Sequence, residues 1–80
     1  KSGDVTNEQL KNLYENSKKC YWCEKDLING DIHLDHFYPI SLGGKHTIAN
    51  LVLTCSKCNL KKCAKNPYDF AREIKKEICQ

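Results

Sequence analysis

Apolar and polar positions in the first part of the chain follow the period of a helix. Within residues 6–17 the apolar side chains recur at helical spacing, at Leu10, Leu13 and Tyr14. Thr6 is a favourable N-cap, and Gln9 three residues later completes the pattern of a capping box. We therefore expect a helix over residues 6–17.

Turn signals and short apolar runs alternate through the middle of the chain. Asn29-Gly30 is a strong signal for a two-residue hairpin turn, with a short strand on either side and the second strand over residues 31–36. Pro39 and Gly43-Gly44 then mark a loop. The apolar run 51–54 after this loop predicts another strand.

The remainder of the chain favours two further helices. One opens at Cys55 and is expected to extend to about Lys65. Asn66 and Pro67 fit the N-cap and the first residue of a last helix, because proline is favoured at the first helical position. We expect this helix over about residues 67–79.

This order of elements, strand, loop, strand and helix with a further helix at each end, predicts a small α+β fold. We expect one domain over residues 1–80, with a core at about residues 20–65. A chain of 80 residues buries only a modest core and usually needs a disulfide or a metal ion for stability. The six cysteines supply candidates for either.

Composition and charge narrow the class of partner. No apolar stretch approaches the roughly 18 residues of a membrane span and no signal-peptide pattern opens the chain, so we expect an intracellular protein without a membrane partner. The net charge is +3, with basic residues gathered in residues 55–80. Such a segment suits phosphate contact, although a solvated lysine-rich helix has the same composition. Three aromatic side chains could stack on bases, but we expect them in the core: Tyr21, Trp22 and Phe37.

Four of the cysteines form two CxxC pairs, Cys20 with Cys23 and Cys55 with Cys58. A CxxC turn presents both sulfurs to one ion, and zinc binds four thiolates in a closed tetrahedral site. The sequence therefore predicts one structural zinc ion that holds the N-terminal pair against the C-terminal helix. Because four thiolates leave no open position for a substrate, this zinc would not be the catalyst.

Two other interpretations of the cysteines have less support. Disulfides belong mainly to secreted chains, and a redox motif does not explain why CxxC occurs twice. Cys63 and Cys79 lie in neither turn, so we expect free thiols there, and nothing in the sequence supports a disulfide between them.

Several chemically active side chains lie near the ends of the predicted core elements. Asp35 is a hard oxygen donor suited to magnesium or manganese. His36 can accept a proton from water near neutral pH. Asn59 offers a second oxygen donor, and Lys61 and Lys62 can contact phosphate.

Asp35 and His36 alone are a weak signal, because such a dipeptide is common at surface turns and strand ends. In a regular strand the two would point to opposite faces, with Asp35 on the face of His33. Both reach one phosphate only if the strand ends there, which Pro39 favours. His33 could then contact phosphate or metal, or else be an exposed strand residue, and His46 is expected on the loop surface.

The order and spacing of these residues resemble the HNH endonuclease family, also called the ββα-metal or His-Me finger nucleases. The matching positions, within about residues 20–62, are Asp35-His36, Pro39, Gly43-Gly44, Asn50-Leu51, Cys55-x-x-Cys58-Asn59 and Lys62. The third position of the family name is Asn59 and not histidine, so the chain is similar to the four-cysteine H-N-N variants.

The resemblance implies a metal-dependent endonuclease that hydrolyses phosphodiester bonds, in DNA rather than RNA. It makes His36 the general base that activates water. Asp35 and Asn59 would hold one catalytic Mg²⁺ or Mn²⁺ that stabilises the leaving 3′ oxygen, since an all-oxygen ligand set suits these ions. Asn50 would tie down the loop and orient His36.

Two alternatives stay open at this point. One is a catalytically inactive zinc-binding module that binds nucleic acid or a protein partner. The other is a zinc-ribbon interaction domain, which explains the cysteines but not the order of Asp35, His36, Asn50 and Asn59. For a nuclease we expect nucleic acid as the partner, and cleavage of both strands would require a homodimer or an additional domain.

Overall fold

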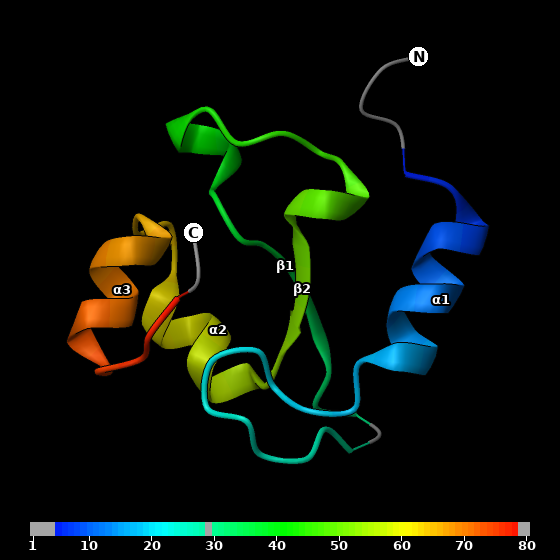
Figure 1. Ribbon diagram of the computed structural model, residues 1–80, viewed down its shortest axis with the longest axis horizontal. Helices are drawn as coiled ribbons and strands as arrows, with labels where there is room; N and C mark the ends of the chain where they lie inside the picture. The colour runs from blue at the N-terminus through cyan, green and yellow to red at the C-terminus, as the bar shows by residue number, and fades with distance from the viewer. Residues whose placement is uncertain (1–4, 29, 79–80) are drawn as a thin grey trace.

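The computed structural model describes residues 5–28 and 30–78, and it has the α+β architecture that the sequence predicts. The helices and strands, in chain order, are α1 (Asn7–Asn16), β1 (His33–His36), β2 (Leu51–Thr54), α2 (Ser56–Lys62) and α3 (Pro67–Glu73). The two strands lie in the centre, with α1 on one side and α2 and α3 on the other (Figure 1). Within the described ranges no helix has the length and apolar character to cross a membrane.

Helix α1 forms as its sequence predicts. Thr6 Oγ1 accepts a hydrogen bond from Gln9 N at 3.0 Å, and Thr6 N donates to Gln9 Oε1 at 2.9 Å. These two bonds are the reciprocal contacts of a capping box, which satisfies amides that the first helical turn leaves unpaired. The helix packs against β2, so α1 is held to the sheet.

Strands β1 and β2 pair in antiparallel register, with His33 opposite Thr54 and His36 opposite Leu51. The prediction for β2 is confirmed, whereas β1 begins two residues later than expected. Asp31 serves another purpose, because its Oδ1 accepts a hydrogen bond from Ser56 N at 2.8 Å and so caps α2. Hydrogen bonds from the side chain and the backbone of Ser56 hold the pKa of Asp31 below its usual value.

The predicted strand before Asn29 is wrong. Residues 18–28 instead form a turn containing Cys20 and Cys23, closed by a single bridge between Lys19 and Asp26. Asn29, the first residue of the expected hairpin turn, lies outside the described residues. The two cysteines account for the difference, because a CxxC turn presents both sulfurs to one ion and a regular strand does not.

Helix α2 ends at Lys62, three residues before the predicted end at Lys65. Cys63 adopts φ 52°, a left-handed conformation that cannot continue a right-handed helix. The Cys63 thiol is exposed, as expected for a residue outside the CxxC pairs. Cys79 lies outside the described residues, so its state stays a prediction.

Helix α3 begins at Pro67, and Asn66 Oδ1 accepts a hydrogen bond from Tyr68 N at 2.8 Å, which confirms the predicted start and cap. The helix ends at Glu73 and does not continue toward residue 79. Lys75 takes φ 60°, which turns the chain away from the helix axis.

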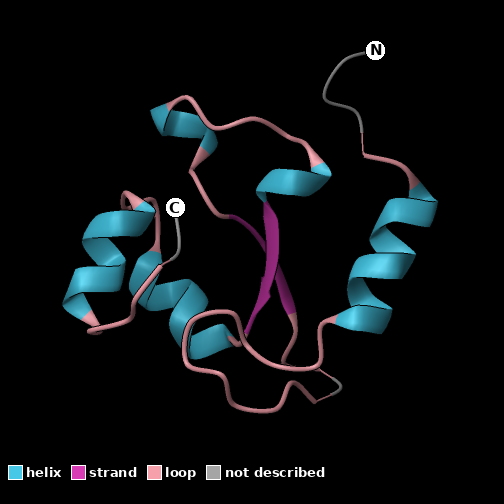
Figure 2. Ribbon diagram, in the orientation of Figure 1, coloured by secondary structure: helices cyan, strands magenta, loops and turns pink. Residues whose placement is uncertain are grey.

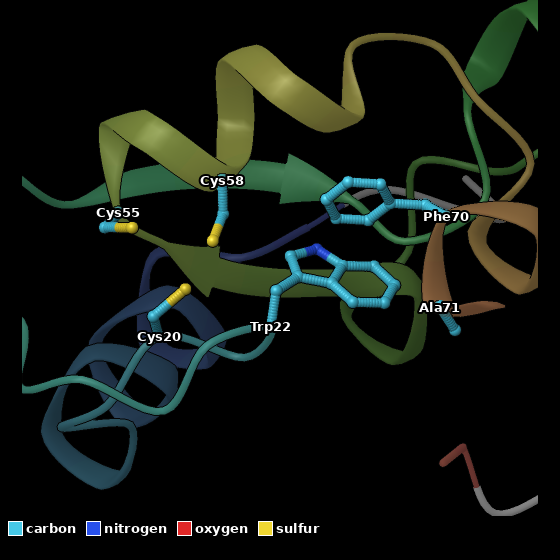
Figure 3. Packing of buried hydrophobic residues seen from close by; sticks show 6 residues of the cluster. All are labelled: Cys20, Trp22, Cys55, Cys58, Phe70 and Ala71. Atoms are coloured by element: carbon cyan, nitrogen blue, oxygen red, sulfur yellow. The ribbon is translucent and has the colours of Figure 1, made fainter. Parts of the chain in front are cut away.

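The core joins the cysteine turn to α3 through Trp22 (Figure 3). The Trp22 ring meets the Phe70 ring edge-on at a centroid distance of 5.0 Å and stacks on Phe37 at 5.8 Å. Trp22 and Phe70 are buried, and Tyr21 packs against them from the side. The expectation that these aromatic residues serve packing is confirmed for the described structure.

Candidate functional site

The four paired cysteines form one cluster. Their sulfurs all lie within 4.8 Å of one another, and Cys23 Sγ is 3.9 Å from Cys55 Sγ. Thiolates placed tetrahedrally at about 2.3 Å from zinc lie about 3.8 Å apart, so the observed spacing fits such an ion. Figure 3 shows the sulfurs of Cys20, Cys55 and Cys58 turned toward a common point. The cluster can hold a metal ion such as zinc.

Hydrogen bonding within the cluster favours a thiolate at one position. Burial acts to raise the pKa of Cys20, but backbone hydrogen bonds from Cys23, Cys55 and Trp22 bring it to about 7. Burial raises the pKa of Cys58 well above its usual value. A bound cation would displace the protons from such buried thiols, because metal ligands must be deprotonated.

Asp35 and His36 occupy the last two positions of β1, where the strand ends. The strand ends ahead of Pro39, but both residues are still paired in the sheet, Asp35 with Val52 and His36 with Leu51. The long connection that follows contains two short 3₁₀ turns, Ile40–Leu42 and Ile48–Asn50 (Figure 2). A Cβ atom added at Gly44 would lie 1.8 Å from Tyr38 O, so only glycine allows the loop to pass this close to the backbone of Tyr38.

Lys62 lies beneath the end of β1 with its side chain fully buried. Its Nζ donates a hydrogen bond to His36 O at 3.1 Å and lies 3.2 Å from Asp35 Oδ2. Asp35 Oδ2 is itself buried and makes no hydrogen bond within the described residues, so the ammonium group compensates its charge. One lysine thus contacts both members of the Asp35-His36 pair.

Asn50 holds the long loop through all of its side-chain hydrogen-bonding groups. Its Oδ1 accepts from Tyr38 N at 2.9 Å, and its Nδ2 donates to Tyr38 O at 3.0 Å and to Lys45 O at 2.8 Å. The backbone carbonyl of Asn50 also accepts from Phe37 N at 2.8 Å. Asn50 therefore joins the segment directly after His36 to the part of the loop around Lys45.

His46 lies against His36, with 3.0 Å between His36 Nε2 and His46 Nδ1. The His46 side chain is otherwise exposed, as the sequence suggested, but its ring is directed at the end of β1. The structure thus brings five residues of the loop and strand region together: Asp35, His36, His46, Asn50 and Lys62.

The other predicted site residues lie on β1 and α2, the elements that also supply Asp35, His36 and Lys62. Asn59 is half-buried on α2, the helix that packs against β1 and supplies Lys62. His33 is half-buried at the start of β1, on the same face as Asp35. Lys61 is exposed on α2. Their roles as metal ligand and phosphate contacts stay predictions.

A family model described as HNH endonuclease matches residues 20–75, which covers the cysteine cluster, both strands, α2 and α3. The chain belongs to the HNH endonuclease family. No curated protein matches it.

Two residues of this HNH domain lie in positions that differ from the sequence-based expectation. The sequence predicts a phosphate contact for Lys62, but its ammonium group faces Asp35 and not solvent. The helical spacing contained the relevant signal, because Lys62 follows the metal-cluster residue Cys58 by four positions and so shares its inward face. No comparable pattern indicates the position of His46, which depends on the path of the loop.

Replacing Asn50 tests the loop contacts of the HNH domain. Asn50→Ala removes three hydrogen bonds, and at about 0.5–1.5 kcal/mol each we expect the free energy of unfolding to fall by about 2–4 kcal/mol. Asn50→Asp is the matched variant, since it keeps the acceptor for Tyr38 N but sets a carboxylate oxygen against the carbonyls of Tyr38 and Lys45. Urea unfolding should therefore rank Asn50→Asp no higher than Asn50→Ala, and both below wild type. An Ala variant as stable as wild type would contradict this role.

Proposed function

We propose that this chain is a metal-dependent endonuclease that hydrolyses phosphodiester bonds in DNA. The observation that carries the proposal is the joint placement of Asp35 and His36 at the end of β1, where Lys62 and Asn50 hold both residues and the segment that follows them. Membership of the HNH family supports the same conclusion. A module that only binds nucleic acid has no need for a fixed carboxylate next to a fixed imidazole.

The donor set near β1 suits a divalent cation. Asp35 Oδ2 faces Lys62, which leaves Oδ1 as the carboxylate oxygen available to a metal ion. Asn59 supplies an amide oxygen from the packed helix α2. Oxygen donors of this kind favour Mg²⁺ or Mn²⁺ over softer ions. Such a cation would neutralise charge on the scissile phosphate and the leaving 3′ oxygen.

The chain's own residues would supply the remainder of the reaction. His36 takes the proton from the attacking water, which lies in line with the leaving oxygen. The fixed strand end keeps this base and Asp35 at a constant separation, so the protein does not need to order them during the reaction. We assign phosphate contacts to His33 and exposed Lys61, and leave Lys62 out because its ammonium group is buried.

Cleavage of supercoiled plasmid by zinc-loaded protein tests this function. We expect nicking after addition of Mg²⁺ or Mn²⁺, and a rate about 10²–10⁴-fold lower for His36→Ala, since a general base contributes about that much. The cation should be added to desalted protein, because a chelator would also remove zinc from the cysteine cluster. Linear product at the same rate as nicked product would indicate a homodimer.

Two aspartates provide a matched comparison. Asp35→Asn should abolish the stimulation by Mg²⁺, whereas Asp26→Asn should leave it unchanged, because Asp26 is an exposed partner of Lys19 in the cysteine turn. If the wild-type protein and His36→Ala behave alike, the chain is a binding module and not a nuclease.

A further inference from the structure

The hydrogen bond between His36 and His46 determines which nitrogen of His36 can act as a base. The two rings meet through Nε2 of His36 and Nδ1 of His46, and their planes are tilted by 58° with centroids 5.2 Å apart. This geometry is that of a hydrogen bond between ring nitrogens and not of stacked faces. One of the two nitrogens must therefore carry the proton, and the other must accept it.

The two possible proton positions have opposite consequences. If His36 Nε2 carries the proton, its Nδ1 has a free lone pair and can accept a proton from water. If His46 Nδ1 carries the proton, Nδ1 of neutral His36 is protonated and cannot act as a base. Exposed neutral histidine prefers the proton on Nε2, which makes Nδ1 of the exposed His46 the acceptor.

Asn50 holds together the two backbone segments that carry these rings. It binds the backbone of Phe37 and Tyr38, directly after His36, and the carbonyl of Lys45, directly before His46. Lys62 fixes the carbonyl of His36 as well. The loop closure therefore brings together the backbone segments that carry the two imidazoles, and the exposed His46 side chain completes the contact.

We infer that His46 is a positioning residue for catalysis: it accepts a hydrogen bond from His36 Nε2 and so holds His36 in the tautomer and orientation that leave Nδ1 free for water. This inference rests on the proposed nuclease function. It also gives a path by which Asn50 influences the base, through Lys45 and His46.

Three substitutions at His46 distinguish the positioning of His36 from a direct contact with nucleic acid. His46→Ala removes the acceptor, and His46→Gln moves the polar group beyond the place of Nδ1. His46→Asn puts an amide oxygen where Nδ1 stands. We expect kcat for plasmid nicking to fall about 10–100-fold in the Ala and Gln variants with KM unchanged, and the Asn variant to recover most of it.

Nitrogen NMR of histidine-labelled, zinc-loaded protein measures the tautomer of His36 independently of DNA cleavage. The three histidines make assignment by substitution direct. In wild type and His46→Asn, neutral His36 should carry its proton on Nε2, and in His46→Ala and His46→Gln it should become a mixture of tautomers. His46→Ala combined with His36→Ala should be no slower than His36→Ala alone, because His46 acts through His36.

Other outcomes would overturn the inference. A wild-type His36 protonated on Nδ1, or a tautomer that His46→Ala does not change, would contradict the hydrogen-bond assignment. A raised KM with unchanged kcat would make His46 a nucleic-acid contact instead. An inactive wild-type protein with the expected tautomer pattern would refute the nuclease function alone, since the pairing is measured independently of cleavage.

Discussion

Removal of the metal ion from the cysteine cluster is expected to unfold the domain. Zinc binding to four-ligand peptide sites contributes about 10–16 kcal/mol, whereas a chain of 80 residues has a net stability of about 4–12 kcal/mol. Cys20, Cys55 and Cys58 are also members of the buried cluster around Trp22 and Phe70. Loss of the ion would therefore leave buried thiols in place of the connection between the cysteine turn and α2.

Two cysteine variants test this expectation. Cys58→Ser should lose bound zinc and the folded far-ultraviolet circular dichroism signal at 25 °C. Cys63→Ser is the matched control, because its thiol is exposed and outside the four-sulfur cluster, and it should keep one zinc per chain and the wild-type melting curve. A Cys58→Ser protein that is folded without metal would show that the hydrophobic core alone is sufficient.

Local chemistry explains why much of the fold could be predicted. The capping box at Thr6 and the start of α3 at Pro67 depend on interactions within a few residues, and the strand over residues 51–54 is marked by its apolar run. The cysteine cluster was predictable for a different reason, since two CxxC turns have few other uses at this spacing. The structure groups these four sulfurs as the pattern indicated.

The remainder depends on contacts between distant segments. Helix α2 ends early because Cys63 takes a left-handed backbone conformation, and α3 ends early before Lys75 does the same. Neither residue is a glycine, so the sequence carries no marker of these turns. The position of His46 beside His36 results from loop closure by Asn50, which links residues 12 positions apart.

Replacement of Lys62 is expected to have the largest effect of any lysine in the described chain. Lys62→Met leaves the Asp35 carboxylate without its ion-pair partner and His36 O without its donor. Breaking a fully buried pair costs about 3–5 kcal/mol. Because the Asp35 side chain is 16% exposed, we expect a somewhat smaller loss of about 2–4 kcal/mol in the free energy of unfolding.

Urea unfolding of three further proteins isolates the ion pair. Lys61→Met, at the exposed neighbouring lysine, should change stability by no more than about 0.5 kcal/mol. Asp35→Asn alone, and combined with Lys62→Met, completes a double-mutant cycle. The combined variant should be more stable than the sum of the single losses predicts, because it removes the uncompensated carboxylate together with its partner. Additive losses would mean that Lys62 stabilises the domain through packing and its bond to His36. The ion pair between Lys62 and Asp35 would then make no contribution to stability.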